Sequence, residues 1–174
     1  VPFVYDTACD FKEGLALVNK YYEYGYIDTK GNEIIPLQYD KPDNLGFKDG
    51  LACMVKAGKR GALDKTGKEV IPFIYDELYG FTEGLAIFEQ NGRYGCINIE
   101  GTIVIPPDYE ALCEFSEGLA AARLNGRWGY INKENQIVIP FEYKIVENFS
   151  EGLALVESDG RRAYFIDKNN EVNI

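Results

Sequence analysis

The stretch Phe115-Ser116-Glu117-Gly118-Leu119-Ala120 decides the fold, because variants of it occur five times in the chain. Each copy reads Phe, any residue, Glu or Asp, Gly, Leu, Ala, and the copies begin at Phe11, Phe47, Phe81, Phe115 and Phe149. Successive copies of the glycine are 36, 34, 34 and 34 residues apart. A fixed period of this length is typical of repeat architectures. The 174 residues therefore hold five tandem repeats of about 34 residues.

Turn signals divide each repeat into short strands. Eight residues after the shared glycine come Asn-Gly or Asp-Gly pairs, which favour tight hairpins because both central residues adopt positive φ. These pairs are Asn91-Gly92, Asn125-Gly126 and Asp159-Gly160. An aromatic-Gly segment such as Trp128-Gly129 follows, and a run such as Val138-Ile139-Pro140 comes after a second turn. Each repeat is therefore predicted to be a three-stranded antiparallel meander whose third strand ends at its proline.

The first strand of each repeat is apolar on both faces, as in Leu85-Ala86-Ile87-Phe88. Such a strand must be covered on both faces, so neighbouring repeats are expected to stack, with the recurring alanine where the next backbone comes close. The linkers have room for a short fourth strand. We expect an all-β domain whose meanders form an open solenoid or curved array; a five-bladed β-propeller is the alternative. The repeats of this single domain span approximately 1–35, 36–71, 72–105, 106–139 and 140–174.

Composition excludes several classes of function. The formal net charge is −10, which disfavours nucleic acid and anionic membrane surfaces as partners. No apolar run approaches the roughly 18 residues that a membrane span needs, so no membrane insertion is expected. The chain has no His, which removes the commonest general base and metal ligand. Its four Cys form no C-x-x-C pair. We therefore expect no catalytic residues, no metal and no cofactor.

The pattern between Phe115 and Tyr143 resembles the bacterial WG-repeat family. It reads Phe-Ser-Glu-Gly-Leu-Ala, then Asn-Gly-Arg-Trp-Gly-Tyr-Ile-Asn, then Ile-Val-Ile-Pro-Phe-Glu-Tyr, and the resemblance extends over the whole chain. The fourth repeat alone has the literal Trp128-Gly129; the others have Tyr24-Gly25, Arg60-Gly61, Tyr94-Gly95 and Ala163-Tyr164. The resemblance implies a β-rich accessory or interaction module without catalytic residues, often beside other domains.

Three recurring features each have a structural and a functional interpretation. The aromatic column Tyr24, Tyr94 and Trp128 packs between repeats or stacks on a glycan or peptide. The acids before the shared glycine, with bases before the aromatic position, form an inter-repeat ion-pair ladder or a charged groove. The Asp or Asn before the second turn bonds the turn backbone or binds calcium. Recurrence at one register favours the structural interpretation of the aromatic column, and the structural interpretation is also favoured for the charged residues. Calcium is disfavoured because Lys30 and Lys65 stand where a ligand belongs.

Function is better sought where one copy departs from the others. The first repeat replaces the Asn-Gly turn with Tyr21-Tyr22, followed by Tyr24. Exposed aromatic rings at a hairpin tip are costly unless something covers them. The linker to the second repeat is two residues longer, near Lys41 and Asn44. These five residues are the candidate binding surface.

The leading hypothesis is a non-catalytic module for protein–protein interaction or scaffolding, with a protein as its partner. The chain begins at Val1 without an initiator Met, so we expect it to be part of a larger bacterial protein. A carbohydrate-binding or cell-surface accessory module is an alternative, with a glycan as the ligand. A hydrolase is a third hypothesis, because two carboxylates suffice for a glycosidase.

Overall fold

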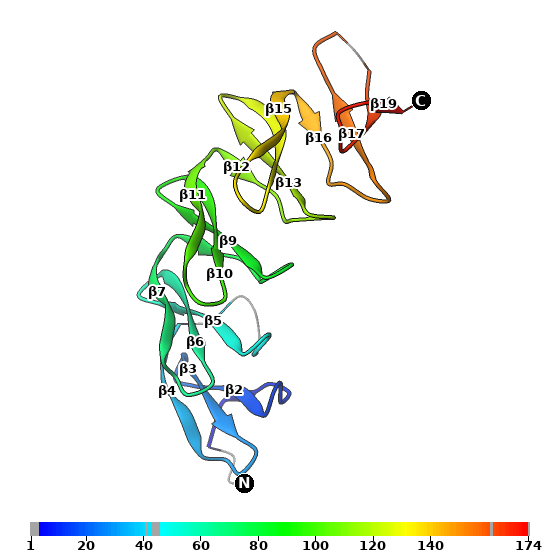
Figure 1. Ribbon diagram of the computed structural model, residues 1–174. Coiled ribbons are helices and arrows are strands. Elements are labelled where there is room, and N and C mark those ends of the chain that lie inside the picture. Colours follow the sequence, from blue (N-terminus) through cyan, green and yellow to red (C-terminus); the bar gives the residue numbers. More distant parts are fainter. Residues whose placement is uncertain (1–3, 41, 43–45, 161, 174) are drawn as a thin grey trace. The chain divides into compact units, whose positions relative to one another are not determined.

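A computed structural model describes residues 4–40, 42, 46–160 and 162–173 of the chain (Figure 1). These residues form short β-strands joined by turns, arranged in five antiparallel sheets of three or four strands. The part of the chain that the structure describes contains no helix, and so none that could span a membrane. The prediction of an all-β chain built from five antiparallel units is confirmed.

The residues divide into two compact units. Unit 1 comprises residues 1–81 and 99–101, and unit 2 comprises residues 82–98 and 102–174. Unit 1 contains the sheet β1 (Thr7–Ala8), β2 (Leu15–Lys20), β3 (Glu23–Asp28) and β4 (Glu33–Tyr39), then the sheet β5 (Leu51–Lys56), β6 (Lys59–Asp64) and β7 (Glu69–Tyr75), and then β8 (Glu77–Leu78).

Unit 2 repeats the same order of strands. It contains β9 (Leu85–Gln90), β10 (Arg93–Asn98) and β11 (Ile103–Tyr109); then β12 (Ala111–Leu112), β13 (Leu119–Leu124), β14 (Arg127–Asn132) and β15 (Ile137–Tyr143); and finally β16 (Ile145–Val146), β17 (Leu153–Glu157), β18 (Tyr164–Asp167) and β19 (Val172–Asn173). Two-residue strands such as β1, β12 and β16 are the short fourth strands for which the linkers had room.

The prediction that the third strand ends at its proline is wrong. In the first four repeats this strand continues for three residues beyond the proline to a buried tyrosine, as in β15, where Pro140 is followed by Tyr143. Proline is tolerated inside this strand because it lies at the edge of its sheet. The pairing of β15 with β14 also shifts in register between Trp128 and Tyr130, next to the proline. An edge position and a bulge together accommodate a residue that donates no hydrogen bond.

The Glu-Gly pair of the repeated stretch forms a tight hairpin before each first strand. Ser116 and Leu119 exchange backbone N–H···O bonds of 2.9 and 3.1 Å. Between them, Glu117 and Gly118 have φ of 52° and 84°. Positive φ at both central residues is the signature of a type I′ turn, and glycine adopts it without a steric cost. The recurring glycine is therefore a turn requirement.

The core lies between consecutive sheets, as the two-faced apolar strands predict. In unit 1, Leu15 and Leu17 of β2 pack in one cluster with Ala52 and Met54 of β5. In unit 2, Leu119 and Ala121 of β13 pack with Ala154 and Val156 of β17. Successive strand residues point to opposite faces, so the Leu side of one sheet meets the Ala side of the next. Both of these clusters therefore need two repeats, and stacking of neighbouring repeats is confirmed within each unit.

Candidate functional site

The hairpin between β2 and β3 carries the candidate residues Tyr21 and Tyr22. Their φ values are 54° and 69°, so both are in the left-handed region that a type I′ turn requires. The equivalent turns between β9 and β10 and between β13 and β14 use Asn-Gly in the same conformation. Tyr21 is 78% exposed and Tyr22 is 89% exposed. The first repeat thus presents two solvent-facing rings on a turn that disfavours tyrosine.

Neighbouring groups hold this turn in place. The backbone N–H of Tyr21 donates to Oδ2 of Asp6 at 2.8 Å. The ammonium group of Lys20 lies 5.4 Å from the centre of the Tyr21 ring, within the range of a cation–π contact. The backbone is therefore anchored by Asp6, while the Tyr22 ring projects beyond it.

Tyr24 does not belong to the same exposed surface. It is half-buried and packs against the core cluster of unit 1, as Tyr94 and Trp128 pack against clusters of unit 2. The geometry favours the structural interpretation of the aromatic column. Lys41 and Asn44, the two remaining candidates, lie outside the residues that the structure describes.

The glycine after the aromatic position has a steric role. A Cβ added to Gly25, Gly95 or Gly129 would lie 2.4, 2.4 or 2.5 Å from the carbonyl oxygen of the isoleucine before the proline in the third strand. Real Cβ contacts are essentially never shorter than 3.0 Å. The aromatic-Gly motif therefore lets the second and third strands approach each other closely at the register shift.

The acidic residues before the shared glycine form an inter-repeat ladder. Each of three acids forms an ion pair with a lysine in the second turn of the next repeat: Glu13 with Lys65 at 2.8 Å, Glu83 with Lys133 at 3.0 Å and Glu117 with Lys168 at 3.1 Å. Hydrogen bonding to the Lys168 ammonium, the largest cause, lowers the pKa of Glu117. These pairs support the interpretation of the acids as an inter-repeat ion-pair ladder. The lysines of the ladder lie in the second turn, however, and are not the basic residues before the aromatic position.

The bases before the aromatic position have other partners. Lys59 pairs with Asp76 at 2.5 Å and Arg127 with Asp159 at 2.5 Å. Arg93 donates to the carbonyl oxygen of Asp108 at 3.2 Å. These partners are not the acids before the shared glycine, and Arg161 lies outside the described residues.

The Asp or Asn before each second turn bonds the turn backbone. Oδ1 of Asp64 accepts bonds from the N–H groups of Thr66 at 2.8 Å and Lys68 at 3.0 Å. Asn132 accepts equivalent bonds from Glu134 and Gln136. The predicted side-chain-to-backbone bonds are therefore confirmed. Among the residues that the structure describes, no group of three His, Cys, Asp or Glu side chains is placed to hold a metal ion.

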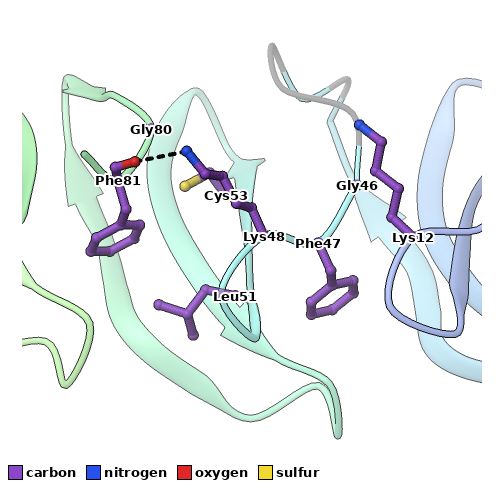
Figure 2. A pocket seen from close by; sticks show the side chains of 8 residues that line it. All are labelled: Lys12, Gly46, Phe47, Lys48, Leu51, Cys53, Gly80 and Phe81. Atoms are coloured by element: carbon purple, nitrogen blue, oxygen red, sulfur yellow. Dashed lines mark hydrogen bonds between the residues drawn. The ribbon is translucent and has the colours of Figure 1, made fainter. Parts of the chain in front are cut away.

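Sequence reasoning missed a pocket in unit 1. It has a volume of about 240 Å³ and is lined by Lys12, Gly46, Phe47, Lys48, Leu51, Cys53, Gly80 and Phe81. Figure 2 shows Lys12 and Phe81 at opposite sides of it, and the Lys48 ammonium bonded to the Phe81 carbonyl oxygen. One signal was available, because Lys12 and Lys48 stand in a column that holds Thr82, Ser116 and Ser150 elsewhere.

Solved structures with a similar fold come from several kinds of protein. They include BamB from Moraxella catarrhalis (10% identity, TM-score 0.50, covering 91% of this chain and 56% of that chain) and a eukaryotic initiation factor (13% identity, TM-score 0.52, 98% and 54%). The WD40 β-propeller domain of Doa1 has a TM-score of 0.42 at 10% identity, with 97% of this chain and 68% of that chain covered. The chain spans little more than half the length of the first two, and the likeness shows the fold alone.

The amino-acid sequence itself shows the family. No curated protein sequence matches the chain. The family described as WG containing repeat matches residues 1–22, 24–59, 61–94, 94–128 and 128–161, which is most of the chain and one match for each repeat. The chain therefore belongs to the WG containing repeat family.

Proposed function

We propose that the chain is a non-catalytic module for protein–protein interaction or scaffolding within a larger bacterial protein. Its proposed contact surface is the Tyr21-Tyr22 hairpin, and Lys41 and Asn44 are further candidates from the sequence alone. One observation carries the proposal: two tyrosines occupy both left-handed positions of a turn and remain almost fully exposed. Within the same chain, Asn91-Gly92 and Asn125-Gly126 make that turn without exposed rings.

The energetics support a binding role for the two rings. A residue other than Gly, Asn or Asp in the left-handed region costs about 1–2 kcal/mol. Exposed aromatic rings contribute nothing to the core of this unit, and their benefit must come from elsewhere. Tyrosine is among the residues that contribute most to protein interfaces, because a rigid ring buries a large area at a small entropic cost.

The test is partner capture with a matched pair of variants. A photo-crosslinking residue in place of Tyr22 identifies the neighbour in cells, and the purified partner is then titrated against the domain. Tyr21→Asn with Tyr22→Gly copies the turn of the third repeat, so we expect an intact fold and binding weaker by at least about 30-fold, the equivalent of about 2 kcal/mol.

The control changes another exposed residue of the same unit. Lys30→Ser lies in the second turn of the first repeat and is expected to leave binding unchanged. Full binding by the double variant, or equal losses in the double variant and the control, would contradict the proposed surface.

A glycan is the second candidate ligand, because exposed tyrosine rings also stack on sugars. It predicts a specific signal on a glycan array that the double variant loses. A blank array together with capture of a protein would remove this candidate.

We further propose that the five sheets form one domain as an open array, with a closed five-bladed ring as the alternative. The support is the repeat of about 34 residues, which is short for a four-stranded blade. Small-angle scattering separates an extended particle from a ring.

A further inference from the structure

The pocket of unit 1 lies where the repeats depart from their common pattern at two positions. The first is the residue after the phenylalanine of the repeated stretch, which is lysine in the first two repeats and Thr or Ser in the others. The second is the residue before that phenylalanine, which is Gly46 and Gly80 at this pocket but Glu114 and Asn148 in unit 2. Residues that differ between copies are not required by the repeat fold itself.

Lys48 forms a hydrogen bond between repeats that an uncharged side chain forms elsewhere in the chain. Nζ of Lys48 donates to the carbonyl oxygen of Phe81 at 2.9 Å. At the equivalent place in unit 2, Oγ of Ser116 donates to the carbonyl oxygen of Phe149 at 2.7 Å. A hydroxyl group is therefore sufficient for this bond between repeats. The bond to Phe81 uses one of the three N–H donors of an ammonium group, so Lys48 brings further donors and a charge into the pocket.

The two glycines differ in what a side chain at each position would meet. A Cβ built on Gly80 has no heavy atom within 4 Å, and its φ is outside the left-handed region. A side chain such as that of Glu114 could therefore occupy this position, and its absence leaves space. At Gly46 a Cβ would lie 2.6 Å from Cδ of Lys12. Glycine at this position lets the Lys12 chain lie against the backbone at the other side of the pocket.

The remaining walls are apolar or neutral. Phe47, Leu51 and Phe81 belong to the buried core and contribute apolar surface. Cys53 is half-buried, and burial raises the pKa of its thiol to about 11, so it carries no negative charge at neutral pH. Of the residues lining the pocket, the two charged ones are both lysines. Asp10 lines the neighbouring hollow beside Lys12.

We propose that this pocket binds a carboxylate carried on a compact apolar group. The Lys48 ammonium group binds the carboxylate, Lys12 adds positive charge, and the apolar part contacts Phe47, Leu51 and Phe81. The volume of about 240 Å³ is below the roughly 300–1,000 Å³ of pockets for drug-sized ligands, so the occupant has the size of one side chain. The C-terminal residue of a peptide and a small aryl carboxylic acid share this chemistry. The site is independent of the Tyr21-Tyr22 hairpin.

The experiment is an NMR titration of the whole chain with 3-phenylpropionate, using its neutral amide and acetate as controls. We expect saturable shifts of the Leu51, Cys53 and Gly80 amides with the carboxylate. The neutral amide should bind at least about tenfold more weakly, since a hydrogen bond between charged groups contributes more than 1.4 kcal/mol. Acetate should bind more weakly because it lacks the apolar part. No saturable shift below about 10 mM, or equal binding of acid and amide, would overturn the proposal.

Two variants test the residues that carry the proposal. Lys48→Ser introduces the residue of the fourth repeat and keeps a donor for the Phe81 carbonyl oxygen, and Gly80→Glu introduces that repeat's acid. We expect each to retain a dispersed spectrum and to weaken 3-phenylpropionate binding at least about tenfold. Lys30→Ser and the Tyr21→Asn/Tyr22→Gly variant should bind normally. Unchanged binding in both pocket variants would overturn the assignment of Lys48.

Peptides distinguish the two sources of the carboxylate. A short peptide ending in Phe with a free carboxylate is compared with the same peptide amidated at its C-terminus. Tighter binding of the free acid than of 3-phenylpropionate assigns the pocket to a chain end, and weaker binding assigns it to a small acid. Equal binding of the free and amidated peptides, with 3-phenylpropionate also failing to bind, would contradict carboxylate recognition.

Discussion

Adding one methyl group to Gly129 should separate the second and third strands of the fourth repeat. The Cβ of Gly129→Ala would lie 2.5 Å from the carbonyl oxygen of Ile139 and 2.8 Å from both backbone C and O of Pro140. Relief to the 3.0 Å limit requires a movement of 3.0 − 2.5 = 0.5 Å. The φ of Gly129 is outside the left-handed region, so the expected cost is steric.

The size of the effect follows from what must move. The atoms in contact are backbone atoms of β15, which cannot rotate away as a flexible side chain does. Overpacking typically costs about 1–3 kcal/mol, and each hydrogen bond lost from the β14–β15 ladder adds about 1 kcal/mol. We therefore expect Gly129→Ala to lower the free energy of unfolding by about 3 kcal/mol.

The assay is urea unfolding followed by tryptophan fluorescence. Trp128 is the one tryptophan of the chain and precedes Gly129, so its signal reports on unit 2. Gly126→Ala is the matched control: its φ is +76° and a Cβ would meet no heavy atom within 4 Å, so it should cost only backbone strain, about 1 kcal/mol. Equal losses in the two variants, or a loss below about 0.5 kcal/mol for Gly129→Ala, would refute the steric argument.

Three further predictions follow from hydrogen bonds and pKa shifts. Hydrogen bonding to Thr66, the largest cause, lowers the pKa of the Asp64 carboxyl group in the folded protein. The stability that ionised Asp64 contributes is therefore present above its unfolded-state pKa of about 3.9, and it is lost as the pH falls through the lower folded-state pKa. Asp64→Asn should keep the turn and remove this dependence, and acid unfolding monitored by circular dichroism checks it. Burial raises the pKa of Tyr143 to about 12, so its contribution is complete below about pH 10 and is lost as pH rises through about 12. Tyr143→Phe should remove the 2.5 Å hydrogen bond to Oδ1 of Asn170 and lower the free energy of unfolding by about 1 kcal/mol at neutral pH. It should also weaken the loss of stability at alkaline pH, which urea unfolding between about pH 8 and about 12 measures. Glu117→Gln should keep an acceptor for the Gly152 N–H but lose the ion pair with Lys168. The variant should therefore be slightly less stable than the original chain at low salt and equally stable at high salt, because salt screens the ion pair. A stability difference that stays the same at high salt would contradict the ladder.

Local turn chemistry made much of the fold predictable. Asn125-Gly126 specifies a type I′ hairpin by itself, and Asp64 or Asn132 specifies the bonds of the second turn, because all partners lie within four residues. The period of the repeated stretch then extends these local predictions along the chain. Stacking followed from strands that are apolar on both faces.

Contacts that depend on the pairing between strands and between repeats were not predictable. The third strand continues through Pro140 because it lies at a sheet edge beside a register shift, and neither feature is visible in a sequence pattern. The ladder pairs Glu117 with Lys168 instead of a base before an aromatic residue, because stacking brings the second turn of the next repeat over the acid. The pocket needs Lys12, Lys48 and Gly80 of three repeats, so no single repeat reveals it.

The central claim is that recurring residues hold the repeats together while Tyr21 and Tyr22 are kept at a cost to the fold. Amide hydrogen exchange of β2 and β3 in the Tyr21→Asn/Tyr22→Gly variant tests it without any partner. Replacing two strained tyrosines by the favoured Asn-Gly pair should stabilise this hairpin by about 2–4 kcal/mol and slow exchange about 30-fold or more. Faster exchange would show that the tyrosines stabilise the hairpin, which would contradict the claim.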